Sequence, residues 1–154
     1  MNDQDPTFML EALQLADQAA ERGEVPVGAV VVRDGEIIAR GYNLREAWQD
    51  PTAHAESIAM RRAALFLGSW RLERCTVYVT LEPCPMCAGA MVLARVHRCV
   101  FGCTDPKGGY VGTLGDLSQV SALNHQYEVT GGVLADECSL KLKTFFRQLR
   151  QKSS

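Results

Sequence analysis

Apolar residues recur at helical spacing in several parts of this chain of 154 residues, with charged residues between them. The first such segment, residues 8–22, carries Leu13, Ala16 and Ala20 on one side and is followed by Gly23. This spacing predicts an amphipathic helix that stops at the glycine. The same pattern predicts three more helices, at residues 53–67 with Thr52 as N-cap, 86–96 with Pro85 before it, and 136–150.

Short runs rich in β-branched residues predict five strands between these helices. They cover residues 27–32, 36–42, 76–81, 98–102 and 126–130. Asp34-Gly35 separates the first two runs, and Asp-Gly at this place is a strong hairpin signal. Residues 43–50 and 104–115 are expected to be loops. Strands that alternate with helices are typical of a layered α/β domain with a mixed sheet.

Length and composition predict one globular domain, spanning residues 1–154. Apolar residues make up 47% and charged residues 22%, which is ordinary for such a domain. No apolar run approaches the roughly 20 residues that cross a bilayer, so no membrane association is expected. Residues 1–7 contain Asp3 and Asp5 and no basic residue, unlike a secretory signal, and we therefore expect a cytoplasmic protein.

The charges are unevenly distributed along the chain. The formal net charge is −2, which argues against a wholly basic nucleic-acid-binding surface but allows a local patch. Acidic residues predominate up to Glu24, whereas residues 139–154 contain basic residues and no acid. The basic residues of that last segment are Lys141, Lys143, Arg147, Arg150 and Lys152.

The residues that indicate chemistry are His54 and the pair Cys84 and Cys87. The two cysteines are three positions apart at the start of a predicted helix, so they share a face, and a helix N-terminus favours the thiolate form. Two cysteines and one histidine provide three ligands for Zn²⁺, and a catalytic zinc keeps its fourth position for water. The sequence therefore predicts one zinc ion per chain.

Glu56 follows His54 by two residues and is the candidate general base. A zinc bound by two thiolates and a neutral imidazole carries no net charge, so a nearby base is useful for activating water. The whole pattern, His-x-Glu followed by Pro-Cys-x-x-Cys, is the signature of the zinc-dependent base and nucleoside deaminases. Taken alone, Cys-x-x-Cys also fits a thiol redox pair or a structural zinc site.

The sequence resembles the bacterial tRNA-specific adenosine deaminases, which convert the wobble adenosine of a tRNA to inosine. The resemblance rests on stretches spread over almost the whole chain. They are VPVGAVVV at 25–32, DPTAHAE at 50–56, VYVTLEPCPMCAGAM at 77–91, VFG at 100–102, GGVLADEC at 131–138 and FFRQLR at 145–150. The ending favours the tRNA enzymes over the cytosine and guanine deaminases, which share the central motifs more loosely.

The resemblance implies a three-layer, cytidine-deaminase-like fold with a five-stranded mixed sheet flanked by helices. It implies that His54, Cys84 and Cys87 bind zinc and that Glu56 moves protons. It also implies a homodimer that holds the tRNA anticodon loop across both subunits. Asn43 would then hydrogen-bond the flipped base or its sugar. Asp105 would accept a hydrogen bond from RNA, unless it is an ordinary turn residue before Pro106.

Three other functions stay open at this point. They are a deaminase of a free cytosine, guanine or nucleoside, a thiol redox protein using Cys84 and Cys87, and a zinc module that binds without catalysis. The other cysteines lack a metal-binding spacing and are expected to be small buried residues. They are Cys75, Cys99, Cys103 and Cys138. Met86 and Met91 are expected in the core.

Overall fold

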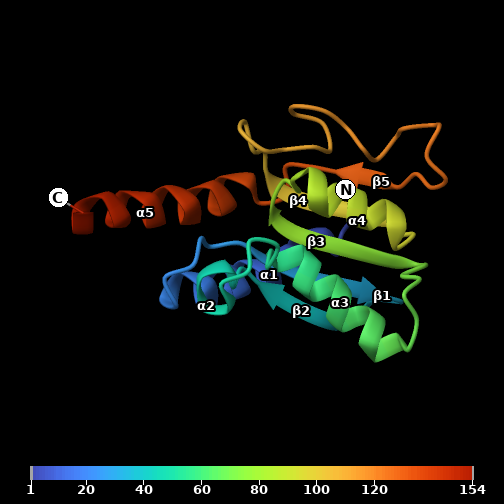
Figure 1. The fold of residues 1–154 in the computed structure, drawn as a ribbon, viewed down its shortest axis with the longest axis horizontal. Helices are drawn as coiled ribbons and strands as arrows, with labels where there is room; N and C mark the ends of the chain where they lie inside the picture. Colours follow the sequence, from blue (N-terminus) through green and yellow to red (C-terminus); the bar gives the residue numbers. More distant parts are fainter. Residues whose placement is uncertain (1, 154) are drawn as a thin grey trace.

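The computed structural model describes residues 2–153, and the terminal residues Met1 and Ser154 of the predicted 1–154 domain lie outside it. Residues 2–153 form five strands and five helices (Figure 1). In chain order they are α1 (Asp5–Glu21), β1 (Gly28–Arg33), β2 (Glu36–Tyr42), α2 (Arg45–Trp48), α3 (Ala55–Leu67), β3 (Cys75–Leu81), α4 (Pro85–Leu93), β4 (Arg98–Cys103), β5 (Glu128–Thr130) and α5 (Ala135–Ser153). Among these residues no helix is long and apolar enough to cross a membrane.

The strands form the expected five-stranded mixed sheet, and their order in it is β2-β1-β3-β4-β5. β1 is antiparallel to both β2 and β3, whereas β4 is parallel to β3 and to β5. The hairpin between β1 and β2 turns at Asp34 and Gly35, which both have positive φ angles, of 53° and 79°. Positive φ at both central residues is the geometry that makes Asp-Gly a hairpin signal.

Alternate residues of the central strands face two separate apolar layers. Val31 and Val77 pack with α3 and α4 on one face, and Val30 and Tyr78 pack with α1 on the other. The beginning of α5 joins the second layer through Cys138. The sheet therefore lies between two helical layers, which confirms the predicted three-layer architecture.

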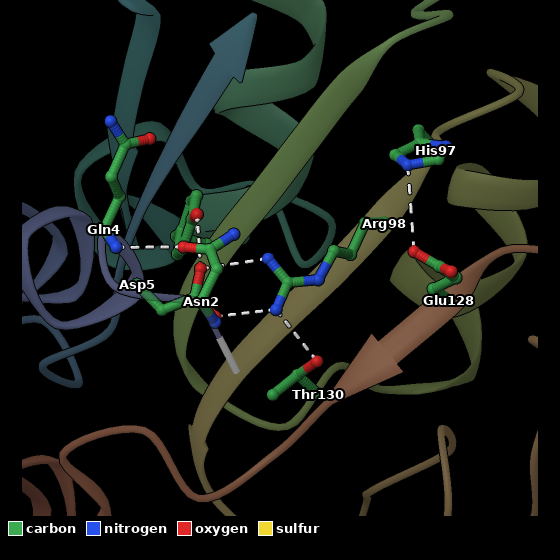
Figure 2. A network of polar contacts seen from close by, with 8 residues as sticks. Asn2, Gln4, Asp5, His97, Arg98, Glu128 and Thr130 are labelled. Carbon is green, nitrogen blue, oxygen red and sulfur yellow. Dashed lines mark hydrogen bonds and ion pairs between the residues drawn. The ribbon is translucent and has the colours of Figure 1, made fainter. Parts of the chain in front are cut away.

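The N-terminus of α1 is fixed to the sheet by a buried ion pair. The Asp5 carboxylate accepts hydrogen bonds from the Arg98 guanidinium at 2.9 and 2.6 Å (Figure 2). It also accepts one from the Tyr78 hydroxyl at 2.7 Å. Arg98 also donates to Thr130 on the neighbouring strand β5. The contact thus joins α1 to three adjacent strands of the sheet.

Two local predictions around residues 43–55 are wrong. The expected loop contains the short helix α2, whose Glu46 and Ala47 amides donate to the buried Glu24 carboxylate at 3.0 and 2.7 Å. Helix α3 begins at Ala55, with His54 and not Thr52 as its N-cap. The Thr52 amide and hydroxyl bind the Asp50 carboxylate in the preceding turn instead.

The buried cysteines confirm one prediction, and Met86 contradicts another. The four cysteines outside the motif are free and buried. They are Cys75, Cys99, Cys103 and Cys138. Met91 is buried as expected, but Met86 is 38% exposed because it lies in the first turn of α4, on its outer side. Helix α5 runs far beyond the sheet (Figure 1), which leaves Leu140, Phe146 and Leu149 exposed.

Candidate metal centre and active site

The N-termini of α3 and α4 hold the predicted metal ligands. His54 is the N-cap of α3 and Cys84 the N-cap of α4, and both have the extended backbone that suits this position. Pro85 follows Cys84 as the first residue of α4, where its missing N–H costs no hydrogen bond. Cys87 lies one turn further and is buried. Two helix starts therefore bring the separate motifs to one place.

The three side chains have the spacing of a metal site. His54 Nδ1 lies 3.6 Å from Cys84 Sγ and 3.6 Å from Cys87 Sγ. All three ligand atoms lie within 4.8 Å of one another. Around a tetrahedral ion with Zn–S of about 2.3 Å and Zn–N of about 2.0 Å, an N···S edge measures roughly 3.5 Å. The donor set and the distances both fit a Cys₂His site, so the cluster can hold a metal ion.

Mutual hydrogen bonding and charge shift the proton equilibria of these ligands. A hydrogen bond from Cys87, together with His54, lowers the pKa of Cys84 to about 4. The bond to Cys84 and burial raise the pKa of Cys87, because the two neighbouring thiols resist carrying two negative charges. The bond to Cys84 also raises the pKa of His54. The site is therefore prepared for a cation, which would stabilise both thiolates.

Glu56 lies beside the cluster in the first turn of α3 and is 4% exposed. Burial raises the pKa of its carboxyl to about 7, and this effect exceeds the opposing effects of hydrogen bonds and of His54. A carboxyl with a pKa near neutrality can both accept and release a proton at physiological pH. The geometry and the pKa thus fit the predicted role in proton transfer.

Asn43 bridges two segments at the edge of the site. Its Oδ1 accepts a hydrogen bond from the Ala55 amide at 2.9 Å, and its Nδ2 donates to the Val25 carbonyl at 3.2 Å. The side chain therefore supplies the acceptor that the start of α3 needs, in the place predicted for Thr52. Asn43 also lines the cavity of the site, so it combines a structural contact with access to the cavity.

Asp105 follows β4 and faces the same cavity. Its Oδ1 accepts hydrogen bonds from the amides of Lys107 at 3.0 Å and Gly108 at 3.1 Å. These contacts make it the turn residue that one interpretation of the sequence expected. Its position in the cavity wall leaves the expected contact with RNA as a prediction.

The cavity between these segments measures about 180 Å³. Its lining residues are Val25, Val27, Asn43, Arg45, His54, Glu56, Leu81, Glu82, Cys84 and Asp105. Drug-sized ligands usually occupy about 300–1,000 Å³, so this cavity suits a smaller group such as one nucleobase. The predicted site residues thus converge on it, with Cys87 behind His54 and Cys84.

Three further residues at this site lie outside the His-x-Glu and Pro-Cys-x-x-Cys motif, and that motif does not indicate their roles. The Ser57 hydroxyl lies 3.2 Å from Cys87 Sγ and can donate to that sulfur when it is a thiolate. In the sequence, the only indication of this role for Ser57 is its position one helical turn after His54. Arg45 lines the cavity from α2, which the sequence did not predict. Glu82, directly before Pro83-Cys84, is buried under the loop after β4.

Comparison with known proteins identifies the family. Residues 1–150 match the family model of the MafB19-like deaminases. The chain is 58% identical over 149 residues to the tRNA-specific adenosine deaminase of Bacillus subtilis, covering 97% of this chain and 92% of that protein. The chain belongs to the tRNA-specific adenosine deaminase family. It is therefore a deaminase, and the thiol redox protein and the non-catalytic zinc module are excluded as its main function.

Solved structures agree with this tRNA-specific adenosine deaminase family. One, from a study of A-to-I editing by tRNA:A34 deaminases at the wobble position of transfer RNA, is 43% identical with a TM-score of 0.85. The matched region spans 88% of this chain and 99% of the chain in that structure. A guanine deaminase from Bacillus subtilis is 40% identical with a TM-score of 0.64, over 75% of this chain and 73% of that one. Both support the cytidine-deaminase-like fold.

Proposed function

We propose that this deaminase converts the wobble adenosine in a tRNA anticodon loop to inosine and releases ammonia. The observation that carries the proposal is the buried Glu56 carboxyl beside the His54, Cys84 and Cys87 cluster, in a cavity the size of one base. The family similarity supports tRNA as the source of that base. We further propose that residues 1–154 act as a single catalytic domain in the cytoplasm, where tRNA substrates are found.

The metal in this proposal is one zinc ion per chain, bound by His54, Cys84 and Cys87. Bound zinc would supply a Lewis acid that activates water. Glu56 accepts the proton that the water loses and delivers it to N1 of adenine as oxygen adds to C6. Glu56 then carries the proton of the new hydroxyl group to the amine, the C6–N6 bond breaks, and ammonia leaves. The balance is one water consumed, one ammonia released and a carbonyl formed at C6.

Two residues are proposed to recognise the substrate. Asn43 retains one amide hydrogen besides the one donated to Val25, and that hydrogen is suited to an acceptor on the base or sugar. Asp105 offers a carboxylate oxygen to a hydroxyl or amino group of RNA. The bases of an anticodon loop are unpaired, so moving one into the cavity costs little.

The expected homodimer is proposed to form on the outer side of α3 and α4. Large apolar side chains are exposed there, and Leu65 is 82% exposed. They are Leu65, Phe66, Trp70, Met86 and Leu93. Exposed apolar patches of this kind mark interaction surfaces. Sedimentation analysis that finds only monomers would contradict this assembly.

The similarity to a guanine deaminase supports a second candidate, deamination of a free nucleobase or nucleoside. One experiment separates the two. The zinc-loaded protein is incubated with total tRNA, with a synthetic anticodon stem-loop and with free adenosine, guanine and cytosine. We expect inosine at the wobble position of tRNA, detected by sequencing, and no comparable turnover of the free compounds. Turnover of a free base without inosine in tRNA would establish the second candidate.

A further inference from the structure

Glu82 carries a carboxylate that the proposed reaction does not use, although it borders the cavity. It follows β3 directly and is 2% exposed. The carboxylate oxygens of Glu82 face the loop between β4 and β5. A buried carboxylate is stable only when its oxygens have partners, so the partners indicate its role.

Within residues 2–153, the two oxygens of Glu82 accept four hydrogen bonds from that loop. Oε1 accepts from the Asp105 amide at 3.1 Å and from the Thr113 hydroxyl. Oε2 accepts from the Val111 amide at 3.2 Å and from the Thr113 amide at 3.1 Å. The carboxylate therefore fixes the loop at two places. One is Asp105, which lines the cavity, and the other is the segment that contains Val111 and Thr113.

The chain passes so close to this carboxylate that one loop residue must be glycine. A Cβ built on Gly109 would lie 2.3 Å from the carboxyl carbon of Glu82. The same loop also binds the turn that carries Cys84, because the Tyr110 amide donates to the Pro83 carbonyl at 2.8 Å. Gly109 thus lets the loop close over Glu82.

We infer that Glu82 is a positioning residue that holds the loop of residues 105–113 in place and so keeps Asp105 preformed in the wall of the substrate cavity. This inference rests on the proposed function. Its oxygens are occupied by loop donors, so it acts through the position of Asp105 and not by touching the base. A preformed wall lowers the ordering cost of binding, and losing it raises KM more than it lowers kcat.

The test compares Glu82→Gln with the parent protein, both loaded with zinc. Glutamine keeps the shape but places an NH₂ group against N–H donors, so one of the two acceptor oxygens is lost. We expect KM for the anticodon stem-loop to rise roughly tenfold, about 1.4 kcal/mol, with kcat within about threefold. Hydrogen exchange at the amides of Asp105, Val111 and Thr113 should accelerate at least tenfold, with zinc content unchanged.

Two further variants keep the test decisive. Thr113→Val removes one hydroxyl donor and leaves Glu82 in place, so it should raise KM and accelerate hydrogen exchange, but less than Glu82→Gln does. If Glu82→Gln does not fold, this variant tests the inference in its place. Glu128→Gln, which changes an exposed carboxylate on β5, should match the parent. A fall in kcat at unchanged KM, loss of zinc, or unchanged exchange would overturn the inference. A parent protein that is inactive on tRNA would refute the proposed function, while the exchange data would still test the contact with the loop.

Discussion

The buried pair between Asp5 and Arg98 gives a stability prediction with a clear dependence on pH. The Asp5 side chain is completely buried, and that of Arg98 is 12% exposed. Although burial alone would raise it, hydrogen bonds from Arg98 and Tyr78 and the charge of Arg98 lower the pKa of Asp5 from 3.8 to about 2. The carboxylate is therefore stabilised more in the folded protein than in the unfolded chain.

The magnitude follows from linkage between protonation and folding. A shift of this size corresponds to about 2.5 kcal/mol of stability. Because the folded-state pKa lies below the unfolded value, this contribution is fully present above about pH 5 and is lost as the pH falls toward 2. Asp5→Asn also leaves the Arg98 guanidinium partly buried without its counter-charge. Removing one partner of a fully buried pair costs about 3–5 kcal/mol. Because Arg98 stays partly exposed and the linkage gives about 2.5 kcal/mol, we expect a loss of roughly 2–4 kcal/mol at pH 7.

Thermal and urea unfolding of Asp5→Asn measure this loss. For a chain of this size, about 2–4 °C of Tm is expected per kcal/mol, so the melting temperature should fall by roughly 4–16 °C. The matched control is Asp17→Asn, which breaks an exposed pair with Lys141 whose side chains are 49% and 40% exposed. Such surface pairs contribute about 0–1 kcal/mol.

The pH series then isolates the ion pair from other effects of the substitution. The difference in unfolding free energy between Asp5→Asn and the parent should shrink between pH 5 and pH 2, and any loss of metal at low pH affects both proteins alike. If both substitutions cost the same at pH 7, or if the difference for Asp5→Asn persists at pH 2, the reasoning from the buried pair is wrong.

Three further predictions concern the active site and its surroundings. Glu56→Gln should keep the metal and the fold but lower kcat by about 10²–10⁴, and a variant that lost its zinc would show instead that Glu56 is a ligand. Ser57→Ala removes the hydroxyl beside Cys87 and should weaken zinc binding by about 10–100-fold in chelator competition, whereas Ser57→Thr should not. Arg147→Ala with Arg150→Ala should weaken tRNA binding and flatten its log–log salt dependence by about one unit per lost phosphate contact, at unchanged zinc content. Equal affinity and slope would mean that these two exposed residues of α5 do not touch RNA.

Much of the candidate site could be predicted because its signals are local. His54 and Glu56 lie two residues apart at one helix start, and Cys84 and Cys87 three apart at another. The strands were predictable for the same reason, since their β-branched runs are bounded by turn residues such as Asp34-Gly35. Each of these features depends on the preferences of neighbouring residues, which the sequence displays directly.

The features that could not be predicted depend on contacts between distant residues. Helix α2 is held by Glu24, whose carboxylate binds the Glu46 amide 22 positions away, and no local pattern in residues 43–50 indicates this. The Asn43 side chain accepts a hydrogen bond from the Ala55 amide, 12 positions along the chain, at the start of α3. The helix therefore begins after Thr52 and not at it. Met86 fits the apolar pattern of α4, but pattern alone does not say which apolar side is covered.

The buried carboxyl groups show how such contacts separate roles that the sequence cannot distinguish. Within residues 2–153 the buried acidic residues are Asp5, Glu24, Glu56 and Glu82. Asp5 is paired with a guanidinium, and Glu24 and Glu82 accept hydrogen bonds from backbone amides of distant segments, so each fixes two parts of the fold together. Burial raises the pKa of the Glu56 carboxyl to about 7, whereas the hydrogen bonds and the charge of Arg98 lower the pKa of Asp5 to about 2. A carboxyl group that is held by strong donors or by a cation favours its charged form and holds structure, whereas one that burial brings close to neutral pH can exchange a proton with a substrate. The surroundings of these four side chains, and not their residue type, therefore support the proposal that Glu56 transfers the proton.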